Sequence, residues 1–225
     1  MRKIDLTGFW LRLTFCLSLL TLRFSLLAET PDIDRLGINV VGTTRQFAYT
    51  NKQAGTYYGE VNSQNSGGWQ GWYINAQKIL SDYSLESKGK IIDRTTATTL
   101  VFPYQIVRTY PDGDEERLTL LDSVNVIAVE YSSKSFPPTI TLQVNDEFVE
   151  AGNSVSAVRL WQRKTPSIEK STPSWITLSF LNSALKSIFV IVAASSPSEA
   201  LELSRNVHEN LSKLIKARKR RMDDL

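Results

Sequence analysis

Short runs of apolar or alternating residues, separated by glycine, proline, asparagine and threonine, fill most of the chain after its first 35 residues. Runs of this length between turn-forming residues are typical of β-strands. They predict strands near residues 38–41, 45–49, 55–61, 69–80, 83–87, 90–93, 98–102, 104–110, 116–121, 125–131, 139–144, 157–162, 175–180 and 185–194. Many short strands at close spacing favour an all-β fold, built as an antiparallel sandwich.

The clearest turn joins two of these strands within Tyr104 to Leu121, whose sequence is YQIVRTY-PDGDE-ERLTLL. Because Pro111 presets one backbone angle and Gly113 supplies a positive φ, the segment predicts a β-hairpin. The acidic residues of its turn, from Asp112 to Glu116, are predicted to be solvated. A later run, LKSIFVIVAAS from Leu185 to Ser195, is almost entirely apolar or β-branched, which predicts a central strand buried on both faces.

One helix is predicted, at the end of the chain. Ser196 to Glu199 reads SPSE, a capping box with proline at the first helical position. One stripe then recurs at three- and four-residue spacing: Ala200, Leu203, Val207, Leu211, Leu214 and Arg218. The basic run Lys216 to Arg221 complements the helix dipole. It is interpreted as a solvated helix end or a surface for another domain, with acidic lipid or nucleic acid as further possibilities. The helix could also fold back onto the sandwich.

The first 28 residues have the pattern of a secretory signal. Arg2, Lys3 and Arg12 precede or flank the apolar run Leu13 to Leu22, and Ala28 suits the residue before a cleavage site. The alternative is an uncleaved N-terminal anchor. Three segments are therefore predicted: a signal peptide at 1–28, a β-sandwich domain at 29–195 and a C-terminal amphipathic linker helix at 196–225. The signal implies a periplasmic or extracellular protein.

Composition excludes several classes of site. The first 28 residues carry four of the 26 basic and one of the 23 acidic residues, which leaves 22 of each in the remainder. A nucleic-acid-binding protein would carry a basic surplus on its folded body, so no nucleic acid partner is expected. Cys16 is the only cysteine and His208 the only histidine. Disulfides, a cysteine nucleophile and a zinc site are therefore not expected, and no metal or cofactor is predicted.

The candidate binding site lies between Gly55 and Asp82, a stretch rich in tyrosine, tryptophan and glycine. Aromatic rings can stack on the C–H face of a sugar, while carboxylate and amide groups bond its hydroxyls. The candidate glycan-binding residues are Tyr58, Glu60, Trp69, Gln70 and Trp72. The alternative is that members of this stretch pack into the sandwich core, which is the more frequent role for a tryptophan in a strand and applies most strongly to Trp72.

Three motifs in this order carry a family resemblance: GGWQGW, then YPDGDEERLTLLD, then a final SPSEAL helix with a basic end. From residue 36 to 225 the chain resembles the N-terminal β-sandwich of six-hairpin glycosidases, the glycogen-debranching, glucoamylase-like and trehalase-like enzymes. The resemblance implies an antiparallel β-supersandwich with one C-terminal linker helix. In that family an (α/α)6 toroid follows and carries both catalytic carboxylates.

No residue of this chain corresponds to those carboxylates, so no catalytic residue is assigned and enzymatic activity of the chain by itself is left open. The resemblance implies the non-catalytic N-terminal domain of an exported glycoside hydrolase, which packs on a catalytic (α/α)6 domain in cis or in trans and shapes its glycan cleft. Two alternatives remain. One is a free-standing carbohydrate-binding or cell-surface β-sandwich module. The other is a structural protein held at a membrane by residues 1–28, since only an uncleaved leader would give a membrane contact.

Overall fold

The computed structural model describes residues 32–43, 45–134, 137–144, 147–151, 159–162, 175–183 and 185–223. The predicted signal at 1–28 and the loop predicted at 163–173 lie outside these residues. Within them, sixteen strands, two short 3-10 helices (η1, Ile33–Leu36; η2, Arg94–Thr96) and one α-helix (α2, Pro197–Asp223) follow one another along the chain.

The strands are β1 (Ile38–Val40), β2 (Gln46–Thr50), β3 (Gly55–Glu60), β4 (Gly71–Ile74), β5 (Gln77–Leu80), β6 (Asp82–Ser87), β7 (Lys90–Ile91), β8 (Thr98–Val101), β9 (Ile106–Thr109), β10 (Glu115–Leu120), β11 (Val126–Ser132), β12 (Thr139–Val144), β13 (Glu147–Ala151), β14 (Arg159–Gln162), β15 (Trp175–Asn182) and β16 (Lys186–Ala194). The predicted strands are found in this order with two differences: the run 69–80 forms two strands, β4 and β5, separated by a turn in which Asn75 and Ala76 have positive φ, and β13 was not predicted. The prediction of an all-β protein with one C-terminal helix is confirmed.

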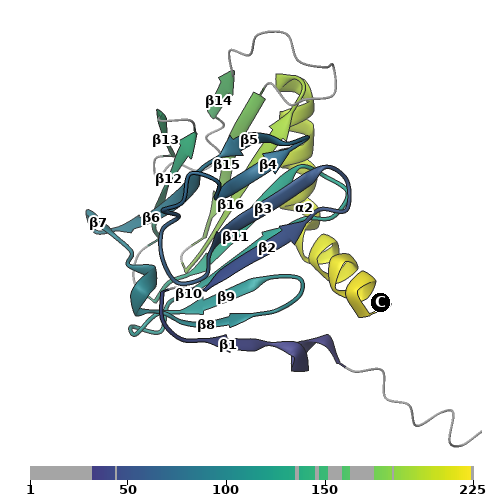
Figure 1. The fold of residues 1–225 in the computed structure, drawn as a ribbon. Coiled ribbons are helices and arrows are strands. Elements are labelled where there is room, and N and C mark those ends of the chain that lie inside the picture. Colours follow the sequence, from purple (N-terminus) through teal and green to yellow (C-terminus); the bar gives the residue numbers. More distant parts are fainter. Residues whose placement is uncertain are drawn as a thin grey trace, which may run out of the picture.

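The described strands form three antiparallel sheets (Figure 1). The largest has eight strands in the order β1-β8-β9-β10-β11-β16-β15-β14, and two four-stranded sheets have the orders β2-β3-β4-β5 and β13-β12-β6-β7. The chain passes between the two smaller sheets at Ser81, whose amide donates to the carbonyl of Gln143 at 2.8 Å. The two small sheets together cover one face of the large sheet.

Side-chain alternation on β11 and β16 builds a core on each face of the large sheet. Ile127 and Val129 of β11 face the small sheets, together with Phe189 and Ile191 of β16, and belong to the larger hydrophobic core. The residues between them face the other way and form a second core with α2. Period-two alternation with both faces apolar gives a nearly continuous apolar strand. The prediction that 185–194 is a buried central strand is therefore confirmed.

Helix α2 covers the second face of the large sheet (Figure 1). Its predicted stripe is buried or partly buried along its whole length, and Ala200, Val207 and Leu211 pack on Val126, Val190 and Val192. Of the arrangements left open by the sequence, the helix folds back onto the sandwich. A 27-residue amphipathic helix has little stability alone in water, and this contact supplies the apolar burial it needs.

The start of α2 is capped, with one change from the predicted capping box. The Ser196 hydroxyl accepts from the Glu199 amide at 3.2 Å, as predicted. The Glu199 carboxylate, however, accepts from the amide of Ser195 at 2.9 Å, one residue earlier than the box requires. The pair still satisfies two amide groups at the helix start.

The hairpin from Tyr104 to Leu121 is confirmed as β9 and β10, with Gly113 at φ +84° in its turn. The prediction that its acidic residues are solvated is wrong for two of them. Glu116 is fully buried and paired with Arg108, and Asp114 is buried beneath the hydroxyls of Tyr131 and Ser133. Strand alternation points Glu116 into the space between the sheets, where the tyrosines of β6 and β9–β10 surround it.

His208 of α2 gives the stability a pH dependence. Its Nε2 lies 3.0 Å from the Ser179 hydroxyl of β15, and burial lowers its pKa below 6.5. Because the unfolded chain binds the proton more tightly, the contribution of neutral His208 to the free energy of unfolding is present above about pH 6.5 and is lost as the pH falls through the folded-state pKa.

We expect urea unfolding to give a lower free energy of unfolding at pH 5 than at pH 7. His208→Gln should make this difference smaller. An equal difference between pH 5 and pH 7 in the variant and the parent would contradict the assignment to His208.

Candidate functional site

The candidate residues lie on or beside the sheet β2-β3-β4-β5, whose two faces have different roles. Tyr57 and Trp72 are paired across β3 and β4 and point into the core, while Tyr58 and Tyr73 point outward. Alternation along β3 also places Glu60 on the outward side, opposite Gln46 of β2. The outward face therefore brings together two of the candidate residues, Tyr58 and Glu60.

Trp72 does not belong to this outward face. Its side chain is fully buried and packs in the larger core, so it offers no surface to a ligand. The alternative in which this tryptophan is a core residue is the one found. The reason is register: Trp72 pairs with Tyr57, and that pair lies on the core side of the sheet.

Three aromatic side chains form the aromatic platform: Tyr58 of β3, Trp69 of the loop between β3 and β4, and Tyr73 of β4. Trp69 is 55% exposed and Tyr58 is 40% exposed. The ring of Tyr58 lies 6.3 Å from that of Trp69 at 72° and 6.5 Å from that of Tyr73 at 76°. Because both contacts are edge-to-face, the rings brace one another and leave the indole face of Trp69 partly open.

Gln70 holds the loop that carries Trp69. Its side-chain oxygen accepts from the amides of Ser66 at 2.8 Å and Gly67 at 2.7 Å, and its backbone amide donates to the Gly67 carbonyl. The side chain is buried. Gln70 thus positions the loop and the Glu60 carboxylate beside it. The sequence analysis proposed Gln70 as a direct ligand contact, but its side chain is buried. The Lys78 ammonium adds a hydrogen bond to the Gly68 carbonyl from the neighbouring strand.

Glu60 lies beside the platform and is nearly buried, at 7% exposure. Its Oε1 accepts from the side-chain amides of Gln70 at 2.5 Å and Gln46 at 3.0 Å. Its Oε2 is buried and has no hydrogen-bond partner among the described residues. Because both carboxylate oxygens are covered by protein, Glu60 organises the Gln46 and Gln70 side chains beneath the platform and is not itself a surface contact.

Two residues that complete the site were missed by the sequence analysis. Gln46 donates to Glu60, and Asn65 accepts from the Glu60 amide at 2.8 Å while donating to the Ser81 carbonyl at 2.9 Å. The Asn65 amide in turn donates to Asp82, which is paired with buried Arg94 at 3.2 Å. An asparagine in a polar loop directly after a strand often bonds nearby backbone, and this was the available signal for Asn65.

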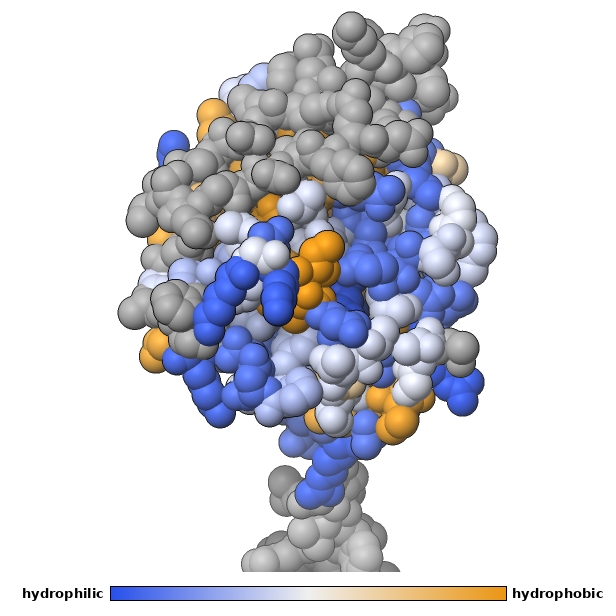
Figure 2. Space-filling view, turned by 90° about the vertical axis from the view of Figure 1, so that its left-hand side faces the viewer, coloured by the Kyte–Doolittle hydropathy of each residue, from blue (hydrophilic) through white to orange (hydrophobic). Residues whose placement is uncertain are grey.

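A hollow of about 600 Å³, whose floor includes Ile91 and Ile92, lies beside the same loop. Ser63, Gln64 and Ser66 line it from the loop, and Asp93, Arg94 and Thr95 line it from η2. The side of the molecule that carries β6 and β7 is largely hydrophilic (Figure 2). One loop therefore has an exposed tryptophan at its end and hydroxyl and amide groups along its side.

The buried carboxylates elsewhere are held by cations or hydroxyls. Burial raises the pKa of Glu116, but the combined effect of Arg108, Arg94 and two tyrosine hydroxyls lowers it by more. The net pKa is below 4.5, so the carboxyl group is ionised at neutral pH. Asp122 is paired with buried Arg218. Among the described residues, no group of three or more His, Cys, Asp or Glu side chains could hold a metal, and no helix is long and apolar enough to cross a membrane.

Comparisons with protein-family models, with curated proteins and with solved structures found no match to this chain. The resemblance to the N-terminal domain of six-hairpin glycosidases therefore stays a prediction from the sequence motifs.

Proposed function

We propose that this protein is a non-catalytic, glycan-binding β-sandwich that acts as the N-terminal domain of an exported glycoside hydrolase, beside an (α/α)6 catalytic domain. The observation that carries glycan binding is the aromatic platform with the Glu60 carboxylate next to it. The assignment to a hydrolase is supported by the order of the GGWQGW, YPDGDEERLTLLD and SPSEAL motifs.

The chemistry of the platform matches that of a sugar ring. A pyranose has an apolar C–H face that can lie on the exposed indole of Trp69, and a rim of hydroxyls that need hydrogen-bond acceptors and donors. The exposed amide of Gln46 supplies both groups, and Glu60 holds this amide in place from below. The network through Gln70 and Asn65 holds these groups before a ligand arrives, which reduces the entropic cost of binding.

A free-standing carbohydrate-binding module is the second candidate, and one observation favours it. The apolar stripe of α2 is already covered by β11 and β16, so the helix does not depend on a further domain for its burial. The two candidates share the glycan site and differ in the partner. A downstream reading frame for an α-helical toroid, whose product binds this chain when the two are expressed together, would favour the hydrolase domain.

Trp69→Ala should weaken glycan binding by at least ~10-fold, or about 1.4 kcal/mol, because it removes the exposed stacking surface. The measurement is calorimetric titration with a panel of α-glucans and α-disaccharides. Leu185→Ala is the matched control, since Leu185 is an equally exposed apolar side chain away from the platform, at 58%. Both variants should unfold at the parent temperature. Equal affinity of Trp69→Ala and the parent for these sugars would show that the aromatic platform is not the glycan-binding site.

Glu60→Gln tests the polar half of the same site. The substitution keeps the size of the side chain and removes the charge that holds the Gln46 and Gln70 amides, so we expect weaker binding of sugars on the same panel with the fold retained. No turnover of these sugars is expected from the protein alone. Robust hydrolysis would show that the carboxylates of this chain form a working pair and that the non-catalytic assignment is wrong.

A further inference from the structure

We infer that the glycan site extends from the aromatic platform into the hollow beside it, and that its ligand is an uncharged oligosaccharide longer than a disaccharide. The hollow, of about 600 Å³, lies between the loop that carries Trp69, the 3-10 helix η2 and the short strand β7. The inference rests on the glycan binding proposed for the platform, and it adds a second contact region and a ligand length to that site.

The platform and the hollow meet at Ser66 and Gly67. Ser66 lines the hollow. The next residue, Gly67, lies so close to the indole that a Cβ built on it would be 3.0 Å from Trp69 Nε1. The amides of Ser66 and Gly67 both donate to the buried Gln70 side chain, which fixes this part of the loop. Because glycine has no side chain, a chain molecule that lies on the indole has room to pass over Gly67 into the hollow.

The hollow offers the two kinds of surface that a sugar needs. Thr43, Gln64 and Ser66 are exposed at its rim, and their hydroxyl and amide groups can each donate and accept hydrogen bonds. Ile91 is 63% exposed and Ile92 is half-buried, and both supply apolar surface to the floor. An apolar floor below a polar rim suits a pyranose, whose C–H face is apolar and whose edge carries hydroxyls.

The charged groups of the hollow favour an uncharged ligand. Arg94 is buried, and its guanidinium donates to Asp82 at 3.2 Å and to the Tyr83 carbonyl at 2.7 Å, so its charge is compensated. Asp93 is exposed, and its Oδ1 accepts from the amide and the hydroxyl of Thr95, which lowers the pKa of this carboxyl group. The ionised Asp93 can accept sugar hydroxyls and would repel an acidic or phosphorylated ligand.

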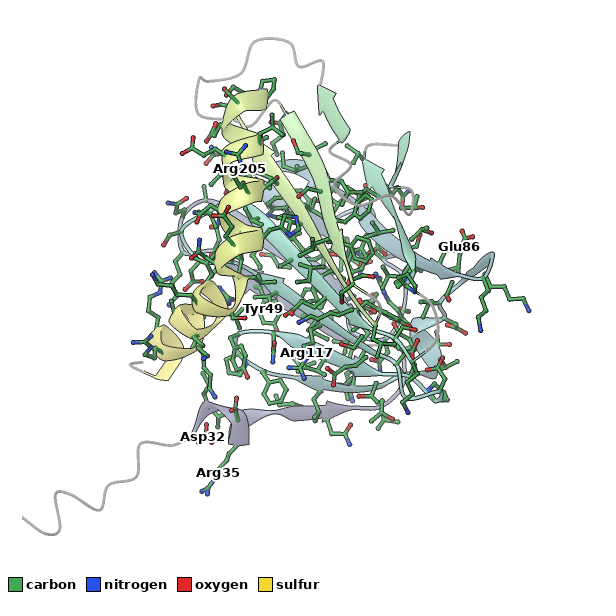
Figure 3. The ribbon with its side chains drawn as sticks, turned by 180° about the vertical axis from the view of Figure 1, so that it is seen from behind. Asp32, Arg35, Tyr49, Glu86, Arg117 and Arg205 are labelled. Carbon is green, nitrogen blue, oxygen red and sulfur yellow. The ribbon has the colours of Figure 1, made fainter. Side chains whose placement is uncertain are left out.

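The polar surface continues beyond the first hollow. The hairpin of β6 and β7 projects from the body of the molecule, with Glu86 near its end and Ile91 opposite Glu86 in the pairing (Figures 1 and 3). A second hollow of about 240 Å³ shares Gln64 and Ile91 with the first and adds polar groups from Ser84, Thr141 and Gln143. Further sugar units therefore meet further hydrogen-bonding groups, and the affinity should rise with the length of the glycan.

The test is calorimetric titration of the full chain with malto-oligosaccharides of increasing length, from maltose to maltoheptaose. We expect the affinity for maltoheptaose to exceed that for maltose by at least ~10-fold, because units that enter the hollow add hydrogen bonds. Gln64→Ala combined with Ile91→Ala should remove most of this gain and change the affinity for maltose by less than ~2-fold. Trp69→Ala should weaken the binding of both sugars.

The matched control is Gln53→Ala combined with Ile38→Ala. It makes the same two changes at exposed side chains, with Ile38 at 65% against 63% for Ile91, and both positions lie outside the two hollows. The control should keep the length dependence of the parent. Both double variants should unfold at the parent temperature, since all four side chains are exposed.

Four outcomes would overturn the inference. Equal affinity for maltose and maltoheptaose would remove the hollow and leave the platform as the glycan site. An equal loss of length dependence in the control and hollow variants would also remove the hollow. Tighter binding of an oligogalacturonate than of a malto-oligosaccharide of the same length would show that the ligand is acidic. Absence of binding to every sugar would remove the proposed glycan binding itself, and this inference with it.

Discussion

Glu116→Gln should lower the free energy of unfolding by about 3–5 kcal/mol, because it leaves a buried guanidinium without its counter-charge. Glu116 and Arg108 are both fully buried, and the Arg108 Nη1 donates to Glu116 Oε1 at 2.6 Å. The Tyr110 hydroxyl donates to Oε2 at 2.5 Å, and the Tyr83 hydroxyl donates to Oε1. Urea unfolding followed by tryptophan fluorescence gives the measurement.

The neighbouring residue provides the control for this result. Glu115 is paired with Arg117 at the same 2.6 Å, but both side chains are partly exposed to solvent. Glu115→Gln should therefore cost less than about 1 kcal/mol, because water screens an exposed pair and replaces the lost partner. Arg108→Met combined with Glu116→Leu should recover much of the loss, since no unpaired charge stays buried. If Glu116→Gln unfolds at the parent midpoint, the buried pair does not stabilise the fold as described.

The same pair predicts an acid limit to stability. Burial raises the pKa of Glu116, but Arg108, Arg94 and the tyrosine hydroxyls outweigh that effect, so the folded-state pKa lies below 4.5. A carboxyl with a lowered pKa stabilises the fold above the unfolded-state pKa, and this contribution is lost as the pH falls through the folded value. Stability should therefore decrease below about pH 4.5, and less steeply in the Arg108→Met, Glu116→Leu variant.

Arg218→Met should have the second-largest effect, about 3 kcal/mol, and should release the C-terminal end of α2 from the sheet. Arg218 is fully buried and bonds Asp122 together with the carbonyls of Tyr104 and Thr50, each at 3.1 Å. Lys52 still lies 3.7 Å from the Asp122 carboxylate, which limits the loss.

The readouts are thermal unfolding and amide hydrogen exchange along α2. A loss of this size corresponds to a melting temperature about 6–12 °C lower in a domain of this length, and exchange should rise most in the last turns of the helix. Arg220→Met is the control, because Arg220 is exposed only two residues away and its replacement should change stability by less than about 0.5 kcal/mol. Equal exchange in the two variants would mean that Arg218 does not hold the helix end.

The amino-acid sequence determined the local structure of this protein. Period-two alternation marked the strands, Pro111 and Gly113 marked the hairpin, and the stripe from Ala200 to Arg218 marked the helix and its buried side. These features depend on backbone preferences and on contacts between residues close in sequence. For the same reason the hairpin register, which puts Arg108 opposite Glu116, was within reach of the sequence.

Only the tertiary structure decided which polar and aromatic residues are buried. Trp69 and Trp72 are three residues apart, yet one is more than half exposed and the other is fully buried. Trp69 lies in the loop, the chain re-enters the sheet at Gly71, and the pairing with Tyr57 turns Trp72 inward. Likewise, Arg218 lies at a position of the apolar stripe of α2. It can be buried there because it forms an ion pair with Asp122, which is 96 residues earlier in the chain. Burial of a charge depends on a partner brought from another part of the chain, and a one-dimensional pattern does not contain that partner.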